Sequence, residues 1–367
     1  MLSSKAAKPF SFDEAKVYSL LQAGKNDKLA DELMEALFHL DNAMVVDYAP
    51  FKQTAEAVSN ALIKVFSDER FELSEKKIIP FINCNMLISN IMFCANRNGD
   101  EVIKAIAKHQ NNLPKILVFY SLRSEARLPL EDIFAAAPVY ASVWWCSVVA
   151  YAYTACSEQV NANREYFSSF SKLELFKLNG ELIKESFPYR AHLYSTCVNE
   201  KNDVAAKKAI NAEIKRLFNV PANSYEADKK KIAIYSHFFI KGHAVYKSIA
   251  PLLYGLKGSY HLTHINTNLG NNAMLDKELF DNIVNFGSGG SIDFSELAKF
   301  MQKEKINILI FPEVGLNSTS IIMANLRLAP IQIACYGHPV TTGSTEIDYF
   351  ICGRDVEDEA NLNKNYI

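Results

Sequence analysis

The chain has 367 residues and a net charge of −2, from 39 Lys and Arg against 41 Asp and Glu. Hydrophobic residues make up 49% and charged residues 22%, which excludes a wholly disordered chain. The balanced charge gives no sign of the basic face that non-specific nucleic-acid binding needs, and the length fits two domains or three.

The first 225 residues predict helices, because apolar residues recur there at spacings of three and four. Leu29, Leu33 and Leu37 are one such series, and Ala206 and Ile210 belong to another. Strand-like alternation is scarce, and no tetratricopeptide-like repeat is found. We therefore expect an irregular all-α domain over residues 1–228.

One stretch of this half, residues 133–156, contains no charged residue and is long enough to cross a bilayer. It also contains Pro138 and several Ser and Thr, and its Ala, Ser and Val residues suit close helix packing. We favour buried helices over a membrane span, which remains the alternative.

A polar segment, NVPANSYEADKKK over residues 219–231, ends the helical pattern and places a domain boundary near residue 228. Beyond it, apolar runs alternate with helical patterns, as in a parallel α/β sheet. We predict a Rossmann-like α/β domain over residues 229–367. Its expected strands cover 232–235, 260–265, 306–311, 331–336 and 347–351, and its expected helices cover 243–256, 291–305 (with Asp293 as the N-cap) and 318–328.

Ligands of open parallel sheets bind beyond the carboxyl ends of the strands. His237 and His243 follow the first expected strand, and a helix opening at Gly242-His243 would direct free backbone N–H groups toward an anion. The alternative is two partly buried histidines that pair with nearby carbonyls. A metal site is less favoured, because no Cys or carboxylate stands at ligand spacing. His261 and His264 are expected on opposite faces of a strand, in structural roles.

The loop Gly337-His-Pro-Val-Thr-Thr-Gly-Ser344 follows another expected strand. Its backbone amides, together with His338, Thr341 and Thr342, are of the kind that cradle a phosphate or a sugar. The alternative is an ordinary polar turn. Walker A, Gly-x-Gly-x-x-Gly and Gly-x-Ser-x-Gly motifs are absent from the sequence, so it does not support simple kinase, dehydrogenase or α/β-hydrolase functions.

The seven cysteines form no Cys-x-x-Cys pair, which excludes zinc ribbons and thioredoxin-like redox motifs. Cys146, Cys335 and Cys352 lie in apolar stretches, as buried free thiols do. The N-terminal segment MLSSKAAKPFSFDEAK has no apolar run of the kind found in signal peptides. We therefore expect a cytoplasmic protein.

Several segments, in this order, resemble the bacterial high-molecular-weight adhesin glycosyltransferases, cytoplasmic N-glycosyltransferases related to the O-GlcNAc transferases in glycosyltransferase family 41. The matching segments are Phe311-Pro-Glu-Val-Gly315, Ala324-Asn-Leu-Arg-Leu-Ala-Pro-Ile-Gln332, Gly337-His-Pro-Val-Thr-Thr-Gly343 and Ile347-Asp-Tyr349. Ser236-His-Phe-Phe239, with His243 and Tyr246, is similar to the first strand and the turn after it.

The resemblance implies an all-α domain followed by two Rossmann-like domains in the GT-B arrangement. It implies inverting, metal-independent transfer of a hexose, from UDP-glucose or a related UDP-sugar, to Asn in Asn-x-Ser/Thr acceptors such as adhesins. His243 matches the histidine that faces the reacting centre. His338, Thr341 and Thr342 match the loop that borders the cleft, and Gln332 matches a structural position.

This sequence departs from the family pattern in one large respect, because it stops shortly after Ile347-Asp-Tyr349. The second, nucleotide-binding Rossmann domain is absent from it, so we predict that this polypeptide alone lacks transferase activity. Two other functions remain as alternatives: a degenerate binding module or partner subunit for a glycosyltransferase or adhesin, and a membrane-attached helper that uses residues 133–156. The sugar and the choice between Asn and Ser/Thr acceptors stay open.

Overall fold

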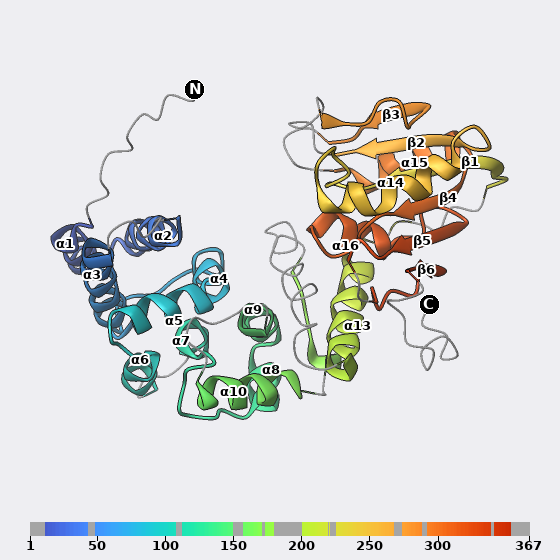
Figure 1. Cartoon of the computed structure of the whole chain (residues 1–367). Helices are drawn as coiled ribbons and strands as arrows, with labels where there is room; N and C mark the ends of the chain where they lie inside the picture. Colours follow the sequence, from blue (N-terminus) through green and yellow to red (C-terminus); the bar gives the residue numbers. More distant parts are fainter. Residues whose placement is uncertain are drawn as a thin grey trace, which may run out of the picture. The chain divides into compact units, whose positions relative to one another are not determined.

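The computed structural model divides the chain into two compact units, Met1–Leu175 and Phe176–Ile367, which we describe separately (Figure 1). The residues that it describes are 12–42, 48–107, 112–149, 157–170, 173–179, 200–218, 220, 225–267, 274–287, 292–338 and 341–353.

In the first unit, every regular element among the described residues is a helix, as the sequence predicts. These helices are α1 (Glu14–Gln22), α2 (Asn26–Asn42), α3 (Tyr48–Phe66), α4 (Glu75–Asn83), α5 (Asn85–Cys94), α6 (Gly99–Ile106), α7 (Leu113–Phe119), α8 (Leu130–Ala136), α9 (Pro138–Val149), α10 (Glu158–Ser168) and the short 3₁₀ helix Leu173–Leu175. Leu29, Leu33 and Leu37 are fully buried along α2. The apolar periodicity thus marks the face that packs into the core.

Aromatic side chains fill the core of this unit. Phe66 lies edge-on to Phe71, Phe81 and Phe119, with ring centroids 5.1–5.2 Å apart. Trp144 stacks on Tyr120 at 5.3 Å. Such pairs add to the stabilisation that burial of the rings provides.

The uncharged stretch 133–156 does not form one long helix. Helix α8 ends at Ala136 and α9 starts at Pro138, and residues 141–149 of α9 are buried. The buried-helix interpretation is therefore confirmed up to Val149, while residues 150–156 lie outside the described part. Within that part, no single helix has the length and apolarity to cross a membrane; α4 and α5, bent by 58°, meet that test only as a pair.

The second unit contains a six-stranded sheet with strand order β3-β2-β1-β4-β5-β6, in which every pairing is parallel. This is the Rossmann order, so the predicted α/β fold class is confirmed. The strands are β1 (Asp228–Tyr235), β2 (His261–Asn266), β3 (Asn282–Asn285), β4 (Ile306–Phe311), β5 (Ile331–Cys335) and β6 (Tyr349–Ile351).

Four described helices accompany the sheet: α13 (Glu200–Leu217), α14 (Ala244–Leu256), α15 (Phe294–Lys303) and α16 (Ser318–Ala324) (Figure 1). Helix α14 packs Val245, Ile249 and Leu253 against a cluster that includes Ile232 of β1 and Ile310 of β4. Both faces of these strands are apolar, as expected for a covered parallel sheet.

Local sequence explains most of these element ends. Asp293 caps α15, as predicted, by accepting hydrogen bonds from two amides of the first turn.

Two elements differ from the prediction. Helix α16 ends at Ala324 rather than at residue 328. Strand β3, with sequence NIVN, was not predicted, because it is short and carries only two apolar residues.

The boundary between the units differs in position from the predicted domain boundary. The change from helices to strands does fall at Asp228, where β1 begins. The second unit, however, begins at Phe176 and includes α13. The reason is that buried side chains of α13, among them Asn211, bond to the loop that precedes β6.

Gly337 lies where the loops after β4 and β5 touch. Its N–H donates to the Pro312 carbonyl at 3.0 Å, and a Cβ at residue 337 would stand 2.3 Å from that oxygen. We expect Gly337→Ala to lower the free energy of unfolding by about 1–3 kcal/mol, because the two loops must separate. Urea titration with far-UV circular dichroism measures this change.

Gly255→Ala is the matched control, because a Cβ there meets nothing within 4 Å and the residue is helical. It should leave stability unchanged or raise it by up to about 1 kcal/mol. Equal destabilisation by the two substitutions would contradict the close approach at Gly337.

Candidate functional site

The candidate site lies at the carboxyl edge of the sheet, where three neighbouring strands end. Strand β4 pairs with β1 on one side and with β5 on the other. The segments after β1, β4 and β5 carry His237, Glu313 and His338, respectively. Parallel strands direct their carboxyl ends to the same edge, so these segments are neighbours along it.

Glu313 is a fully buried carboxyl group in the loop after β4. Ser236, at the end of β1, donates its hydroxyl to Oε2 at 2.6 Å. Within the described residues, Oε1 has no hydrogen-bond partner. Burial raises the pKa of Glu313 to about 8, so the side chain holds a proton at neutral pH.

The two histidines after β1 both contact one aromatic ring, that of Phe238. The His243 ring stacks on Phe238 at 5.1 Å, and the His237 ring meets Phe238 edge-on at 4.9 Å. Burial lowers the pKa of His237, which favours its neutral form. The structure therefore brings these two predicted site residues together.

His243 is the N-cap of α14, and its Nδ1 accepts a hydrogen bond from the Val245 N–H at 3.2 Å. Because Nδ1 is the acceptor, the ring proton lies on Nε2. The side chain can thus present an Nε2–H donor at the positive end of a 13-residue helix.

The turn that carries these histidines is fastened to the segment after β2. The Lys241 N–H donates to the Met274 carbonyl at 2.9 Å, and Lys241 Nζ lies 3.3 Å from Oδ1 of buried Asp276. The hydroxyls of Tyr246 and Tyr254, both on α14, donate to the other oxygen of Asp276. Asp276 thereby fixes the turn and the helix to the same point.

His338, in the loop after β5, is 8% exposed. Burial and the charge of Lys207 lower its pKa to about 4, so the ring is neutral at pH 7. No described residue bonds to its Nε2. A buried polar atom without a partner is an exception that calls for an explanation, such as an ordered water or an ion.

Thr341 and Thr342 shape the loop with both backbone and side chain. Their hydroxyl oxygens accept from the N–H groups of Gly343 and Ser344. The Thr341 carbonyl accepts from Lys207 Nζ, and the Thr342 carbonyl accepts from Asn211 Nδ2, both at 3.0 Å. The threonine hydroxyls therefore stabilise the loop through hydrogen bonds within it, and the threonine carbonyls bind it to α13.

Lys207 is fully buried on α13, an unusual position for an ammonium group. Burial lowers its pKa to about 8, and burial raises the pKa of Asp203, one turn earlier, to about 6. The loop passes close to this side chain: a Cβ at Gly343, which has a φ of +63°, would stand 3.0 Å from Lys207 Cβ.

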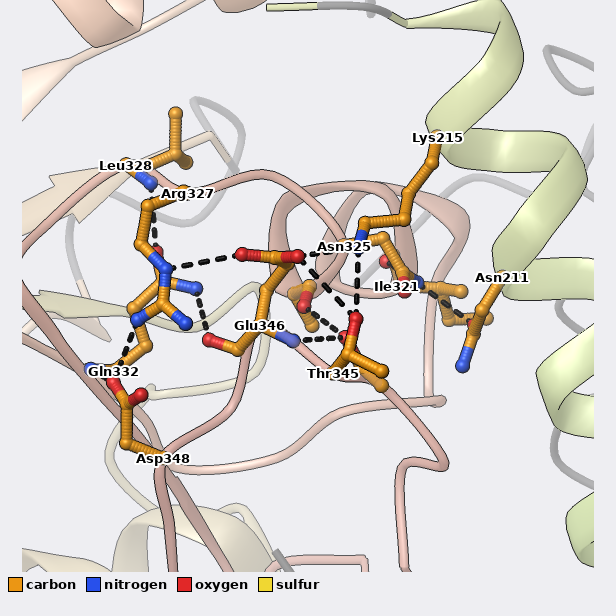
Figure 2. Close-up of polar contacts among 12 residues, drawn as sticks. Asn211, Lys215, Ile321, Asn325, Arg327, Leu328, Gln332, Thr345, Glu346 and Asp348 are labelled. Carbon is orange, nitrogen blue, oxygen red and sulfur yellow. Dashed lines mark hydrogen bonds and ion pairs between the residues drawn. The ribbon is translucent and has the colours of Figure 1, made fainter. Parts of the chain in front are cut away.

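A second network anchors residues 345–348, just before β6, to α13 and to the segment before β5 (Figure 2). Lys215 bonds to Thr345 and pairs with Glu346, and Glu346 also pairs with Arg327 at 3.0 Å. Arg327 in turn pairs with Asp348 at 2.7 Å.

Gln332 lies within the same network, as a structural residue. Its Oε1 accepts from the Leu328 N–H at 2.9 Å, and its Nε2 donates to the Glu346 carbonyl at 2.8 Å. Both ends of the side-chain amide thus serve backbone groups.

The described residues hold no group of three or more His, Cys, Asp or Glu side chains that could bind a metal ion. The site residues described above are histidines, threonines and a buried carboxyl group. Sequence patterns singled out His237, His243, His338, Thr341 and Thr342, but missed Glu313 and Lys207. The signals available for Glu313 were its place just after an apolar strand and its presence in the matching segment Phe311-Pro-Glu-Val-Gly315.

The raised pKa of Glu313 predicts a pH dependence of stability. In the unfolded chain this carboxyl has its ordinary pKa of 4.5, whereas in the folded chain burial raises the pKa to about 8. The unfolded state therefore binds fewer protons between these values, and stability falls as pH rises. Glu313→Gln should flatten this fall, by at most about 1.4 kcal/mol per pH unit.

Urea titrations from pH 5 to pH 8 give the free energy of unfolding at each pH. The effect is the difference between the wild type and Glu313→Gln in the slope of this free energy against pH. Glu226→Gln, at an exposed carboxylate, is the control and should follow the wild-type slope. Identical slopes for the wild type and Glu313→Gln would contradict the protonated state of Glu313.

Comparison with known proteins gives relatives of one kind. The chain is 23% identical over 331 residues to a UDP-glucose:protein N-beta-glucosyltransferase of Actinobacillus pleuropneumoniae serotype 5b (strain L20). A protein with the same description from serotype 7 (strain AP76) matches at the same identity. In both cases 82% of this chain is covered, and the chain spans about half (52%) of the relative's length.

Among solved structures, a mutant O-GlcNAc transferase of Thermobaculum terrenum matches this chain with 12% identity and a TM-score of 0.37. The match covers 93% of this chain and 54% of the transferase chain. No family model matches the chain. The sequence relatives confirm the resemblance seen in the motifs: over 82% of its length, this chain is similar to bacterial protein N-glucosyltransferases.

Proposed function

We propose that this chain supplies the acceptor-side helical domain and the first Rossmann-like domain of an inverting, metal-independent glycosyltransferase. The reaction moves a hexose from a UDP-sugar, such as UDP-glucose, to Asn in Asn-x-Ser/Thr segments of an acceptor protein. Homology to protein N-glucosyltransferases over 82% of the chain supports this class of reaction. The Rossmann strand order supports the role of the second unit as one half of a GT-B enzyme.

The observation that carries the proposal is the geometry of His243. Its Nδ1 is engaged by the Val245 N–H, so Nε2–H is the group left for a substrate. Departure of a nucleoside diphosphate leaves negative charge on phosphate oxygens. A neutral donor at a helix N-terminus stabilises such charge without a metal ion. We therefore assign His243 the role of donating to the developing charge at the reacting centre.

The other predicted site residues would border the substrate. His237 shares the aromatic contact of His243, which places it beside the same turn. The buried Nε2 of His338 provides a polar contact from the loop after β5. Thr341 and Thr342 keep this loop in shape.

The chain spans about half the length of its curated relatives, and we propose that transfer requires further residues of the kind found in their remaining half. On this proposal, the polypeptide of 367 residues alone gives no transfer from UDP-glucose to an Asn-x-Thr peptide. We keep the prediction that the protein acts in the cytoplasm.

A chimaera tests the proposal. The chain is joined, at the end of the matched region, to the remaining part of the Actinobacillus relative and incubated with UDP-glucose and an Asn-x-Thr peptide. We expect glucosylation of Asn, unchanged by EDTA, and a loss in kcat of at least about 100-fold in His243→Ala because a transition-state donor is removed. Mass spectrometry of the peptide measures both.

His261→Ala is the control, because His261 is exposed on β2 and away from the carboxyl edge. Its chimaera should keep the parent rate. A folded chimaera that binds UDP-glucose but transfers nothing would favour a non-catalytic binding module instead. Equal rates for His243→Ala and His261→Ala would contradict the role of His243.

A further inference from the structure

The second unit contains a buried carboxyl group, that of Glu313, to which the proposed transfer assigns no role. The side chain has no exposed surface, and its Oε2 accepts the Ser236 hydroxyl at 2.6 Å. Ser236 is itself only 2% exposed, so water does not compete for this hydrogen bond. The bond therefore joins the loop after β4 to the end of β1.

The Ser236 hydroxyl also belongs to the turn that carries the two histidines, residues 236–243, which we call the histidine turn. Its oxygen accepts from the Phe238 N–H at 3.2 Å. A hydroxyl group has one proton and two acceptor lone pairs, so the same group donates to Glu313 and accepts from Phe238. Serine side chains that bond to the backbone two residues on stabilise turns. Glu313 therefore orients the hydroxyl that shapes the start of the histidine turn.

Phe238 connects the start of the histidine turn to both histidines. Its ring meets the His237 ring edge-on at 4.9 Å and stacks on the His243 ring at 5.1 Å. Its carbonyl accepts from the Ile240 N–H at 2.8 Å, and the Ile240 carbonyl accepts from the His243 N–H at 3.1 Å. A displacement of Phe238 therefore displaces His243 through the ring and through the backbone.

The pKa of Glu313 indicates which groups lie near its carboxyl. Burial raises this pKa to about 8, and the Ser236 hydroxyl, the N–H groups of Phe238 and His237 and its own N–H act in the opposite direction. Apart from its own N–H, these groups all belong to the histidine turn. Among the described residues, Oε1 has no hydrogen-bond partner. The described polar contacts of the carboxyl are thus directed to this turn.

The titratable side chains beside Glu313 carry no charge at pH 7. Its charge acts on Tyr235 of β1 and on Cys335 of β5. Burial raises the pKa of the Cys335 thiol to about 12 and also raises the pKa of Tyr235, and Glu313 adds to both shifts. A neutral side chain with an acceptor oxygen therefore fits the position of Glu313.

We propose that Glu313 is a positioning residue for the histidine turn and acts through Ser236 and Phe238. It holds the rings of His237 and His243 in place without touching a substrate. The contacts that do this lie within the second unit. That the placement of the rings serves glycosyl transfer rests on the function proposed above, so the two parts of the inference are tested separately.

The first test follows the histidine rings of the full chain, produced with isotope-labelled histidine, by NMR at pH 7. Glu313→Leu removes the acceptor for Ser236 and keeps a side chain of similar size. We expect the ring C–H signals of His237 and His243 to shift, while the signal of exposed His261 stays in place. Glu313→Gln keeps an acceptor oxygen and should give signals near those of the wild type. Single His→Gln substitutions assign the three signals.

Two further variants separate positioning from a general loss of packing. Ser236→Ala should shift the signals of both turn histidines. Combined with Glu313→Leu, it should shift them no further than the larger single effect, because both substitutions break the same path. Ser147→Ala is the matched control and should shift neither signal, because Ser147 is a buried serine of α9 whose hydroxyl donates to the Asn83 carbonyl at 2.7 Å. Circular dichroism confirms that each variant is folded.

The second test measures transfer by the chimaera described above. Glu313→Leu should lower kcat at least about tenfold and leave the KM for UDP-glucose within about twofold, because a displaced donor loses contacts made in the transition state. Glu313→Gln should restore most of the rate. An unchanged kcat in Glu313→Leu would contradict the role in transfer. An inactive parent chimaera would count against the proposed function, and the NMR test would still decide the positioning.

Three outcomes of the NMR test would overturn the proposal. The first is that the folded Glu313→Leu chain keeps the wild-type signals of His237 and His243. The second is that Glu313→Gln shifts these signals as far as Glu313→Leu does. The third is that the effects of Ser236→Ala and Glu313→Leu add in full in the double variant.

Discussion

The candidate site depends on a set of buried hydrogen bonds between α13 and the loop that precedes β6. Asn211 bonds through Nδ2 to the Thr342 carbonyl and through Oδ1 to Asn325, and Lys207 bonds to the Thr341 carbonyl. Each such bond contributes about 1 kcal/mol, but a buried carbonyl left without its donor costs about 1–3 kcal/mol. The loop can therefore keep its shape only while α13 is packed beside it.

This constraint explains why a helix that precedes the first strand belongs to the sheet unit. Neighbouring loops depend on similar buried contacts: Gly337 contacts Pro312 beside Glu313, and Asp276 fastens the turn of His243. The groups that would meet a substrate are thus placed by polar partners inside the protein. Preorganisation of this kind suits a site that stabilises developing charge with fixed hydrogen-bond donors.

Much of the fold follows from local sequence, because each element carries its own signal. The uniformly apolar run Ile306–Phe311 is β4 to the residue, and Asp293 caps α15 where its position predicts. Strand β3 has too few apolar residues to be recognised and exists through its pairing with β2.

The site was predicted only in part, because its key contacts join distant segments. The histidines and threonines stand out directly after strands. Lys207, by contrast, lies beside the apolar series of α13 and resembles a solvent-exposed lysine until the loop 134 residues later covers it. The protonated state of Glu313 likewise depends on its burial in the folded chain, which the local sequence does not show.

Amide hydrogen exchange in the loop preceding β6 tests the central claim, that α13 holds this loop in shape. Asn211→Ala should speed exchange at Gly343 and Ser344 by tenfold or more and leave the β1 amides unchanged. Lys208→Ala, at an exposed position of the same helix, should change neither. Unaltered exchange at Gly343 and Ser344 in a folded Asn211→Ala chain would contradict the account.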